Sequence, residues 1–318
     1  MSEIPVISIG ETRVTLFALL AGLFFLAAAA AVTVRLRRRE WKTGPAVLFC
    51  LAAGLLGLAL GRGLFFVIRS EYFLDPMGQF VGLAPLFDFN LGGVTVVGVI
   101  PGVFLGGWIV SRAFGKNAAE TFDAAVVHGL LLFAAILFIE PLSGQGYGPM
   151  MTWPAFCWSP LGIQNGWGDW LLSVSFVEGV LLLIAAGITA GLRLPLPGSR
   201  TLCAAVLLSC MMIIPESLRE DDVLRIFIFA RVTQLGCCVL LVVSAALIWY
   251  RSIRSGMGKG VLFWGVLVLA VALLITGEFA LDKAEWPDGW IYLGMALILA
   301  VTAGMLLNRL IRSQRGNA

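Results

Sequence analysis

The chain has 318 residues, of which 59% are hydrophobic and only 13% are charged. Soluble proteins carry about 25% charged residues, so this composition excludes a cytoplasmic enzyme, a disordered chain and a nucleic-acid-binding domain. A helix that crosses a bilayer needs about 20 apolar residues, and the length accommodates eight or nine such helices. The sequence therefore predicts a polytopic membrane protein with no nucleic-acid partner.

Nine apolar segments can be marked along the chain, at 14–34, 44–68, 91–111, 123–140, 170–192, 201–218, 226–250, 261–281 and 290–308. In hydrocarbon, each backbone N–H and C=O must be hydrogen-bonded within its own segment, so these segments are predicted to be helices. The alternation over about ten residues that is typical of membrane β-barrel strands does not occur. The predicted fold class is an all-α, polytopic membrane helix bundle of about nine spans.

Lysine and arginine predict the orientation of the bundle, because cytoplasmic connections carry an excess of both. The first connection is strongly basic, with Arg35, Arg37, Arg38, Arg39 and Lys42, and the other odd-numbered connections and the C-terminal tail are basic too. By contrast, residues 141–169 contain no Lys or Arg. The predicted orientation places the N-terminus outside and the C-terminus in the cytoplasm.

Two of the connections predicted to be external are long and aromatic. Residues 69–90 are rich in Phe, and residues 141–169 contain Trp153, Trp158 and Trp167. They are interpreted either as an aromatic belt at the level of the lipid headgroups or as a lid that closes a cavity accessible to lipid.

Ionisable residues within membrane segments are costly and usually face a cavity. The candidates are Arg62, Asp123, His128, Glu140, Glu178, Glu216, Arg219, Arg231 and Glu278. Most lie toward the predicted external ends of their helices. They form either a structural network of ion pairs or a site open to the outer half of the bilayer. Because guanidinium binds phosphate through paired hydrogen bonds, the arginines favour an anionic phospholipid as ligand.

The cysteines and the single histidine give little support to a metal site. Five of the six cysteines lie in apolar runs, and only Cys157 lies in a polar loop, where its role is open. With His128 as the only histidine, a zinc or haem site is not expected. We expect neither a metal nor an organic cofactor.

Several segments, in order, resemble motifs of the prolipoprotein diacylglyceryl transferases. The first three are Leu60-Gly61-Arg62, the loop segment Glu71 to Pro76, and the glycine pair Gly92-Gly93 that opens a run to Val99. Asp123 matches the residue that begins the next motif of the family. These bacterial inner-membrane enzymes transfer diacylglyceryl from phosphatidylglycerol to the lipobox cysteine of a lipoprotein precursor.

Four further segments extend the resemblance, which covers about residues 8–250. They are Gln145-Gly146-Tyr147-Gly148-Pro149, Leu172 to Glu178, Met212 to Arg219, and Thr233-Gln234-Leu235-Gly236. The family has seven spans, so the resemblance implies a transferase-like core at 1–255, with external loops 69–90 and 141–169. Residues 256–318 are then an additional two-helix hairpin with a basic cytoplasmic tail.

The resemblance also implies roles for particular residues. Glu178 and Glu216 are the candidates for catalysis. The candidates for binding the lipid headgroup are Arg62, Arg219, Arg231, Gln234 and Tyr147. The implied partners are phosphatidylglycerol or another anionic phospholipid, lipoprotein precursors and the bilayer itself, and the implied location is the bacterial inner membrane.

Three positions depart from the family pattern. Val97 stands in place of a histidine, and Leu137 and Met212 stand in place of arginines. An aliphatic side chain offers no donor to a leaving phosphate and no base to a thiol. Two hypotheses stay open, a diacylglyceryl transferase with rearranged charged groups, and a catalytically silent paralogue that binds phospholipid or a membrane or lipoprotein partner. A solute transporter is weaker, because the sequence lacks the two related halves of such proteins.

Overall fold

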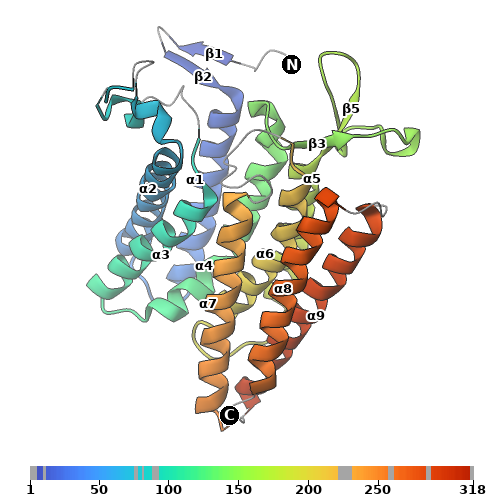
Figure 1. The fold of residues 1–318 in the computed structure, drawn as a ribbon. Helices are drawn as coiled ribbons and strands as arrows, with labels where there is room; N and C mark the ends of the chain where they lie inside the picture. The colour runs from blue at the N-terminus through green and yellow to red at the C-terminus, as the bar shows by residue number, and fades with distance from the viewer. Residues whose placement is uncertain are drawn as a thin grey trace. The chain divides into compact units, whose positions relative to one another are not determined.

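The computed structural model describes residues 6–9, 12–74, 78–80, 82–87, 93–220, 231–256, 261–283 and 288–315. The fold is all-α (Figure 1). Within these ranges, nine helices are long and apolar enough to cross a membrane, which confirms the predicted polytopic helix bundle. They are α1 (Leu16–Arg37), α2 (Thr43–Ile68), α3 (Val96–Ala113), α4 (Ala118–Ile139), α5 (Val174–Gly191), α6 (Ser199–Leu218), α7 (Val232–Arg254), α8 (Val261–Lys283) and α9 (Asp288–Arg315).

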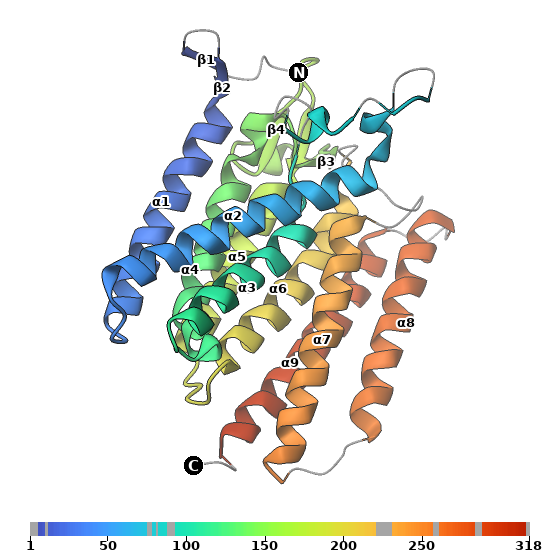
Figure 2. The same cartoon turned by 90° about the vertical axis from the view of Figure 1, so that its left-hand side faces the viewer.

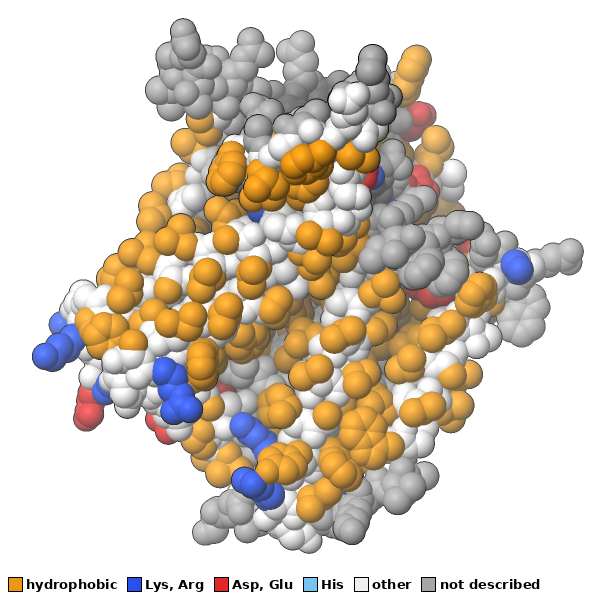
Figure 3. Space-filling view, turned by 60° about the vertical axis from the view of Figure 1, so that its left-hand side comes forward, with side chains coloured by type: hydrophobic (Ala, Val, Ile, Leu, Met, Phe, Trp, Pro, Cys, Tyr) orange, Lys and Arg blue, Asp and Glu red, His pale blue; other side chains and the backbone are white. Residues whose placement is uncertain are grey.

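The outward surfaces of the helices are apolar. Leu55 in α2, Val239 in α7 and Val301 in α9 are each more than 60% exposed. Figure 3 shows hydrophobic side chains spread over the helices of the visible face, with few charged side chains among them. Such surfaces require a lipid solvent, because soluble monomers rarely expose large contiguous apolar patches. The chain is a multi-pass membrane protein.

Short strands occur where the sequence predicted the ends of helices. Residues 14 and 15 belong to strand β2 (Thr12–Thr15), which pairs antiparallel with β1 (Val6–Ile9). Residues 170–173 form β5 (Trp170–Ser173), which pairs with both β3 (Tyr147–Met150) and β4 (Gly162–Gln164). The predicted helix at 170–192 was therefore wrong for its first residues, whose backbone groups are hydrogen-bonded to other strands of this sheet. The first residues of the predicted segment 226–250, up to residue 230, lie outside the described residues.

The loop at 141–169 presents its tryptophans to the surroundings. Trp153 and Trp167 are 70% and 91% exposed, and the ring of Trp153 stacks on that of Phe156. The loop also contains the short helices η4 (Glu140–Ser143) and η5 (Pro154–Phe156). Residues 69–90 hold two more, η1 (Ser70–Phe73) and η2 (Ala84–Phe87).

The chain forms two compact units, of which unit 2 comprises residues 29–125 and 222–236. Its main feature is the packing of α2 against α3 along a row of glycines, Gly98, Gly102 and Gly106 (Figure 2). A Cβ atom added to Gly102 would lie 2.7 Å from the Cα of Gly57. The glycines thus allow the two backbones to touch, as in membrane helix pairs with small residues at every fourth position.

Two apolar clusters complete unit 2. Trp41 lies edge-on to Phe49, with ring centroids 6.1 Å apart, in a cluster that includes residues of α1, α2, α3 and α4. The second cluster contains Phe65, Phe66 and Val232. It lies near Arg62, whose guanidinium carbon is 5.0 Å from the centre of the Phe66 ring.

Unit 1 comprises residues 1–28, 126–221 and 237–318. In it, α6 packs against α5 and against α9, and α9 also packs against α8. The C-terminal hairpin predicted as an addition at 256–318 is therefore part of this unit. Helix α6 is the most buried of the candidate membrane spans, with 67% of its most apolar stretch of 18 residues buried.

Candidate functional site

An arginine surrounded by three carboxylates lies in unit 1. Arg219 donates from Nη1 to Oε2 of Glu178 at 3.1 Å and from Nη2 to Oε1 of Glu140. Its Nη1 also lies 3.7 Å from Oε1 of Glu216. The side chain of Glu178 is fully buried, and those of Arg219 and Glu216 are less than 10% exposed. These four residues are called the Arg219 cluster below.

The local folds of three segments position the cluster. Glu216 and Arg219 lie three residues apart at the C-terminal end of α6 and therefore share one face of it. Glu178 lies in the second turn of α5, and Glu140 begins η4 directly after α4. Two membrane helices and the short helix η4 thus place their polar groups at one point.

The start of strand β3 is fastened to the same region. Ser175 N–H donates to the carbonyl of Gly146 at 3.1 Å, and Glu220 N–H donates to the carbonyl of Tyr147 at 3.0 Å. Gly146 has a φ of 81°, and a Cβ there would lie 2.6 Å from Oγ of Ser175. Only glycine adopts this conformation in this space without strain.

The electrostatics of the cluster favour a fixed ion network. Hydrogen bonds between charged partners are about twice as strong as neutral ones, and burial from water strengthens them further. Removing one partner of a buried ion pair leaves an uncompensated charge, which is strongly destabilising. The Arg219 cluster therefore locks η4, α5 and α6 to one another.

Arg62 holds a different set of groups, in unit 2. It is only 4% exposed, and its Nε donates to the carbonyl of Leu86 at 2.6 Å. Its two Nη atoms donate to the carbonyls of Pro85 and Gly93, each at 3.4 Å. The side chain thus fastens η2 and the residues before α3 to α2.

Arg231 and Gln234 lie at the N-terminal end of α7, also in unit 2. The side-chain oxygen of Gln234 accepts the backbone N–H of Arg231 at 3.0 Å, and both residues are buried. A side chain at the third helical position that binds the preceding backbone N–H is half of a capping box. Gln234 therefore caps the N-terminal end of α7.

The structure brings some of the predicted site residues together. Glu178, Glu216 and Arg219 meet directly, and the backbone of Tyr147 joins the residue after Arg219. Arg62, Arg231 and Gln234 belong to unit 2. Glu140 is part of the cluster although it was not among the predicted site residues. Its signal in the sequence was an ionisable side chain at the end of a predicted membrane segment.

The three positions that depart from the family pattern are apolar in the structure. Leu137 and Met212 are 4% and 1% exposed. Val97 packs against the cluster of Phe65 and Phe66, and its Cγ2 would lie 2.5 Å from a Cβ on Gly236. Hydrocarbon therefore occupies the places where the family has a histidine and two arginines.

Within the residues that the structure describes, no group of three or more His, Cys, Asp or Glu side chains is arranged to hold a metal ion. In comparisons with known proteins, no protein-family model and no curated protein matches this chain. Fold and site together define a multi-pass membrane protein with a buried arginine–carboxylate cluster in unit 1.

Proposed function

We propose that the chain is a divergent relative of the prolipoprotein diacylglyceryl transferases that binds phosphatidylglycerol or another anionic phospholipid in the bacterial inner membrane. One observation carries the proposal. Three segments of unit 1 that carry the resemblance, 145–149, 172–178 and 212–219, converge at the Arg219 cluster. They are far apart in the sequence. Hydrogen bonds join 145–149 to 172–178 and to Glu220, the residue after 212–219, and Arg219 donates to Glu178.

This convergence supports common ancestry better than the motifs alone. Short motifs with several replaced residues arise by chance, and the contact between their polar members is a second observation that agrees with common ancestry. Glu178 and Arg219, the charged residues that survive at the ends of two of the motifs, form a direct ion pair. The backbone carbonyls of Gly146 and Tyr147, in the third motif, accept hydrogen bonds from residues next to this pair in space.

Two activities fit such a relative, and the site favours binding without transfer. A transferase needs a base for the thiol and cationic donors for the departing glycerol phosphate. Glu178 is fully buried and bound to Arg219, whose donors hold carboxylates, and Arg62 holds backbone carbonyls. Val97, Leu137 and Met212 supply neither base nor donor. We therefore infer a paralogue without the transfer chemistry of the family, for which the resemblance implies that phospholipid binding is kept.

The distribution of basic residues supports the location and orientation that go with this function. The odd-numbered connections and the tail are basic, and residues 141–169 carry no Lys or Arg. By the positive-inside rule, the Arg219 cluster, which adjoins 141–169, lies toward the outer face. This is the face on which the family modifies lipoprotein precursors.

A transfer assay tests the proposal. Purified full-length protein is incubated with phosphatidylglycerol and a lipobox peptide, and mass spectrometry measures diacylglyceryl-cysteine, while a separate titration compares binding of phosphatidylglycerol and phosphatidylcholine. We expect selective binding of phosphatidylglycerol and no transfer. Transfer that is abolished by Glu216→Gln but kept in the exposed control Glu71→Gln would overturn the silent-paralogue function and establish the transferase. Equal binding of both lipids would overturn the lipid-binding function itself.

A further inference from the structure

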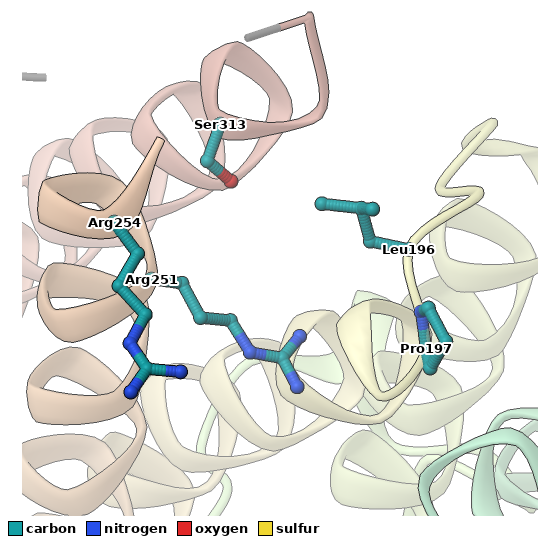
Figure 4. Close-up of a pocket in the computed structure, with 5 residues that line it drawn as sticks. All are labelled: Leu196, Pro197, Arg251, Arg254 and Ser313. Carbon is teal, nitrogen blue, oxygen red and sulfur yellow. The ribbon is translucent and has the colours of Figure 1, made fainter. Parts of the chain in front are cut away.

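A hollow of about 250 Å³ lies in unit 1 at the opposite end of α6 from the Arg219 cluster (Figure 4). It is lined by Leu196 and Pro197 from the α5–α6 connection, Arg251 and Arg254 from α7, and Ser313 from α9. This volume is well above the roughly 10–15 Å³ that a single water molecule needs. The hollow is called the Arg251 pocket below.

We propose that the Arg251 pocket binds the phosphate group of an anionic phospholipid from the membrane leaflet opposite the Arg219 cluster. Helix α6 has 20 residues and begins at Ser199 beside the pocket. At 1.5 Å per residue, its two ends lie about 30 Å apart, which is the thickness of the hydrocarbon core. The pocket is therefore a site separate from the proposed function and does not depend on it.

Two guanidinium groups give the pocket its charge. Figure 4 shows Arg251 extending from α7 toward the α5–α6 connection, and its Nη1 donates to Oγ of Ser199 at 3.2 Å. That bond fixes the guanidinium at the wall of the pocket. Arg254, one turn further along α7, is exposed, and its guanidinium carbon lies 4.6 Å from the centre of the Tyr250 ring.

The positive charge of Arg254 is not neutralised by the protein. Among the residues that the structure describes, no carboxylate lies within ion-pairing distance of it. Paired arginines are suited to phosphate because each presents several N–H donors in a planar fork. The N-terminal end of α6, at Ser199, adds the positive end of a helix dipole near the same wall.

The remaining walls and the surroundings favour a lipid over a free anion. Leu196 and Pro197 give the pocket an apolar side, where glycerol and acyl carbons can pack. Because the pocket lies at the ends of α7 and α9, two of the membrane-spanning helices, a phospholipid can reach it from its own leaflet. Basic pockets between membrane helices on the cytoplasmic side are a known general form of anionic headgroup site, and the positive-inside rule places this end there.

Hydrogen bonds between the end of α9 and the α5–α6 connection form one wall of the pocket. Gln314 accepts the backbone N–H of Leu196 at 2.9 Å through Oε1, and its Nε2 donates to Oγ of Ser199 at 3.1 Å. Ser313, which lines the pocket, is buried and donates to the carbonyl of Leu310. The end of α9 and the α5–α6 connection thus form one preorganised wall.

Hydrogen–deuterium exchange with mass spectrometry tests the site on the full-length protein in detergent. Short-chain phosphatidylglycerol, short-chain phosphatidylcholine and sodium phosphate are added in separate arms, and exchange is measured in peptides covering 192–198. We expect protection by phosphatidylglycerol alone, with an affinity that falls about tenfold in Arg251→Gln and in Arg254→Gln, as expected for the loss of a charged hydrogen bond. The exposed Arg312→Gln, at the same end of the unit, serves as the control and keeps the wild-type affinity.

Each other result contradicts the proposal. Equal protection by phosphatidylcholine means that the anionic charge is not recognised. Protection by sodium phosphate alone assigns the pocket to a soluble anion, and no protection in any arm leaves it without this ligand. Arg251→Gln removes the bond to Ser199, but Gln314 still donates to the same hydroxyl. Arg254 is exposed. A loss of affinity with an unchanged melting temperature therefore reports binding and not misfolding. Transfer or its absence in the lipobox assay does not bear on this result.

Discussion

Arg219 and Glu178 form a 3.1 Å ion pair between the end of α6 and the second turn of α5, with the glutamate fully buried. The pair links two segments that lie 41 residues apart in the sequence. Glu140 and Glu216 surround the same guanidinium. The stability of unit 1 should therefore depend on this one side chain more than on any exposed charge.

The first prediction concerns the loss of that side chain. We expect Arg219→Ala to destabilise the protein by about 3–5 kcal/mol, because it leaves buried carboxylates without their cation. The readout is the unfolding temperature in detergent, followed by tryptophan fluorescence. The matched control is Arg69→Ala, whose ion pair with Glu71 is exposed and should contribute only about 0–1 kcal/mol. Equal shifts in both variants would show that the cluster is not a special determinant of stability.

The second prediction concerns the contact between α2 and α3. Gly102→Ala places a Cβ against the backbone of α2, so the helices must separate, at a cost of about 1–3 kcal/mol or more. Gly187→Ala in α5 is the control, because a Cβ there meets nothing within 4 Å. We expect the melting temperature to fall in the first variant only. An unchanged value for Gly102→Ala would mean that this contact tolerates a wider spacing.

The third prediction concerns Arg62 as the fastener of the loop at 82–87. Arg62→Lys keeps the charge but loses the planar fork that reaches three carbonyls, so the loop should become more sensitive to limited proteolysis, by about tenfold for the loss of one to two kcal/mol. Arg112→Lys, an exposed position in the same unit, is expected to leave the cleavage rate unchanged. If cleavage within 69–90 is the same in both variants, Arg62 does not hold this loop.

The fourth prediction concerns the attachment of α9. Gln314→Ala removes the acceptor of Leu196 N–H and one of two donors to Ser199, which keeps its bond from Arg251. The backbone N–H left without its acceptor costs about 1–3 kcal/mol. Amide exchange at 192–198 should accelerate, while exchange in unit 2 stays as it was. Arg312→Ala, exposed on the same helix, should leave both unchanged. Unaltered exchange at 192–198 in Gln314→Ala would contradict the role of Gln314 as a clamp.

The helices were predictable because each one reflects a local property. A run of about 20 apolar residues in lipid can satisfy its backbone only as a helix, so all nine segments were found with small errors at their ends. The strands were missed because β3, β4 and β5 are only three or four residues long, and β3 pairs with β5 across the whole of the loop between them. Trp170 to Ser173 are as apolar as the helix that follows them, and composition alone cannot separate the two.

The candidate site was predictable in part. Charged residues in membrane segments are rare and stand out, which identified Glu178, Glu216 and Arg219. Their partners were not predictable, since the membrane segments contain three arginines, Arg62, Arg219 and Arg231, and no local pattern says which of them meets the glutamates. In the structure, Glu178 and Glu216 lie beside Arg219. The positive φ of Gly146 and the position of Ser175 beside it follow from tertiary packing, for which the sequence carries no local signal.

The position of Ser313 and Gln314 near the end of α9 has a consequence for how the protein is made. The α5–α6 connection emerges from the ribosome more than a hundred residues before the residues that clamp it. Until the last helix has entered the bilayer, that connection lacks its partner and the wall formed by the two is incomplete. The wall around the arginines of α7 is therefore among the last parts of the protein to be assembled during biosynthesis.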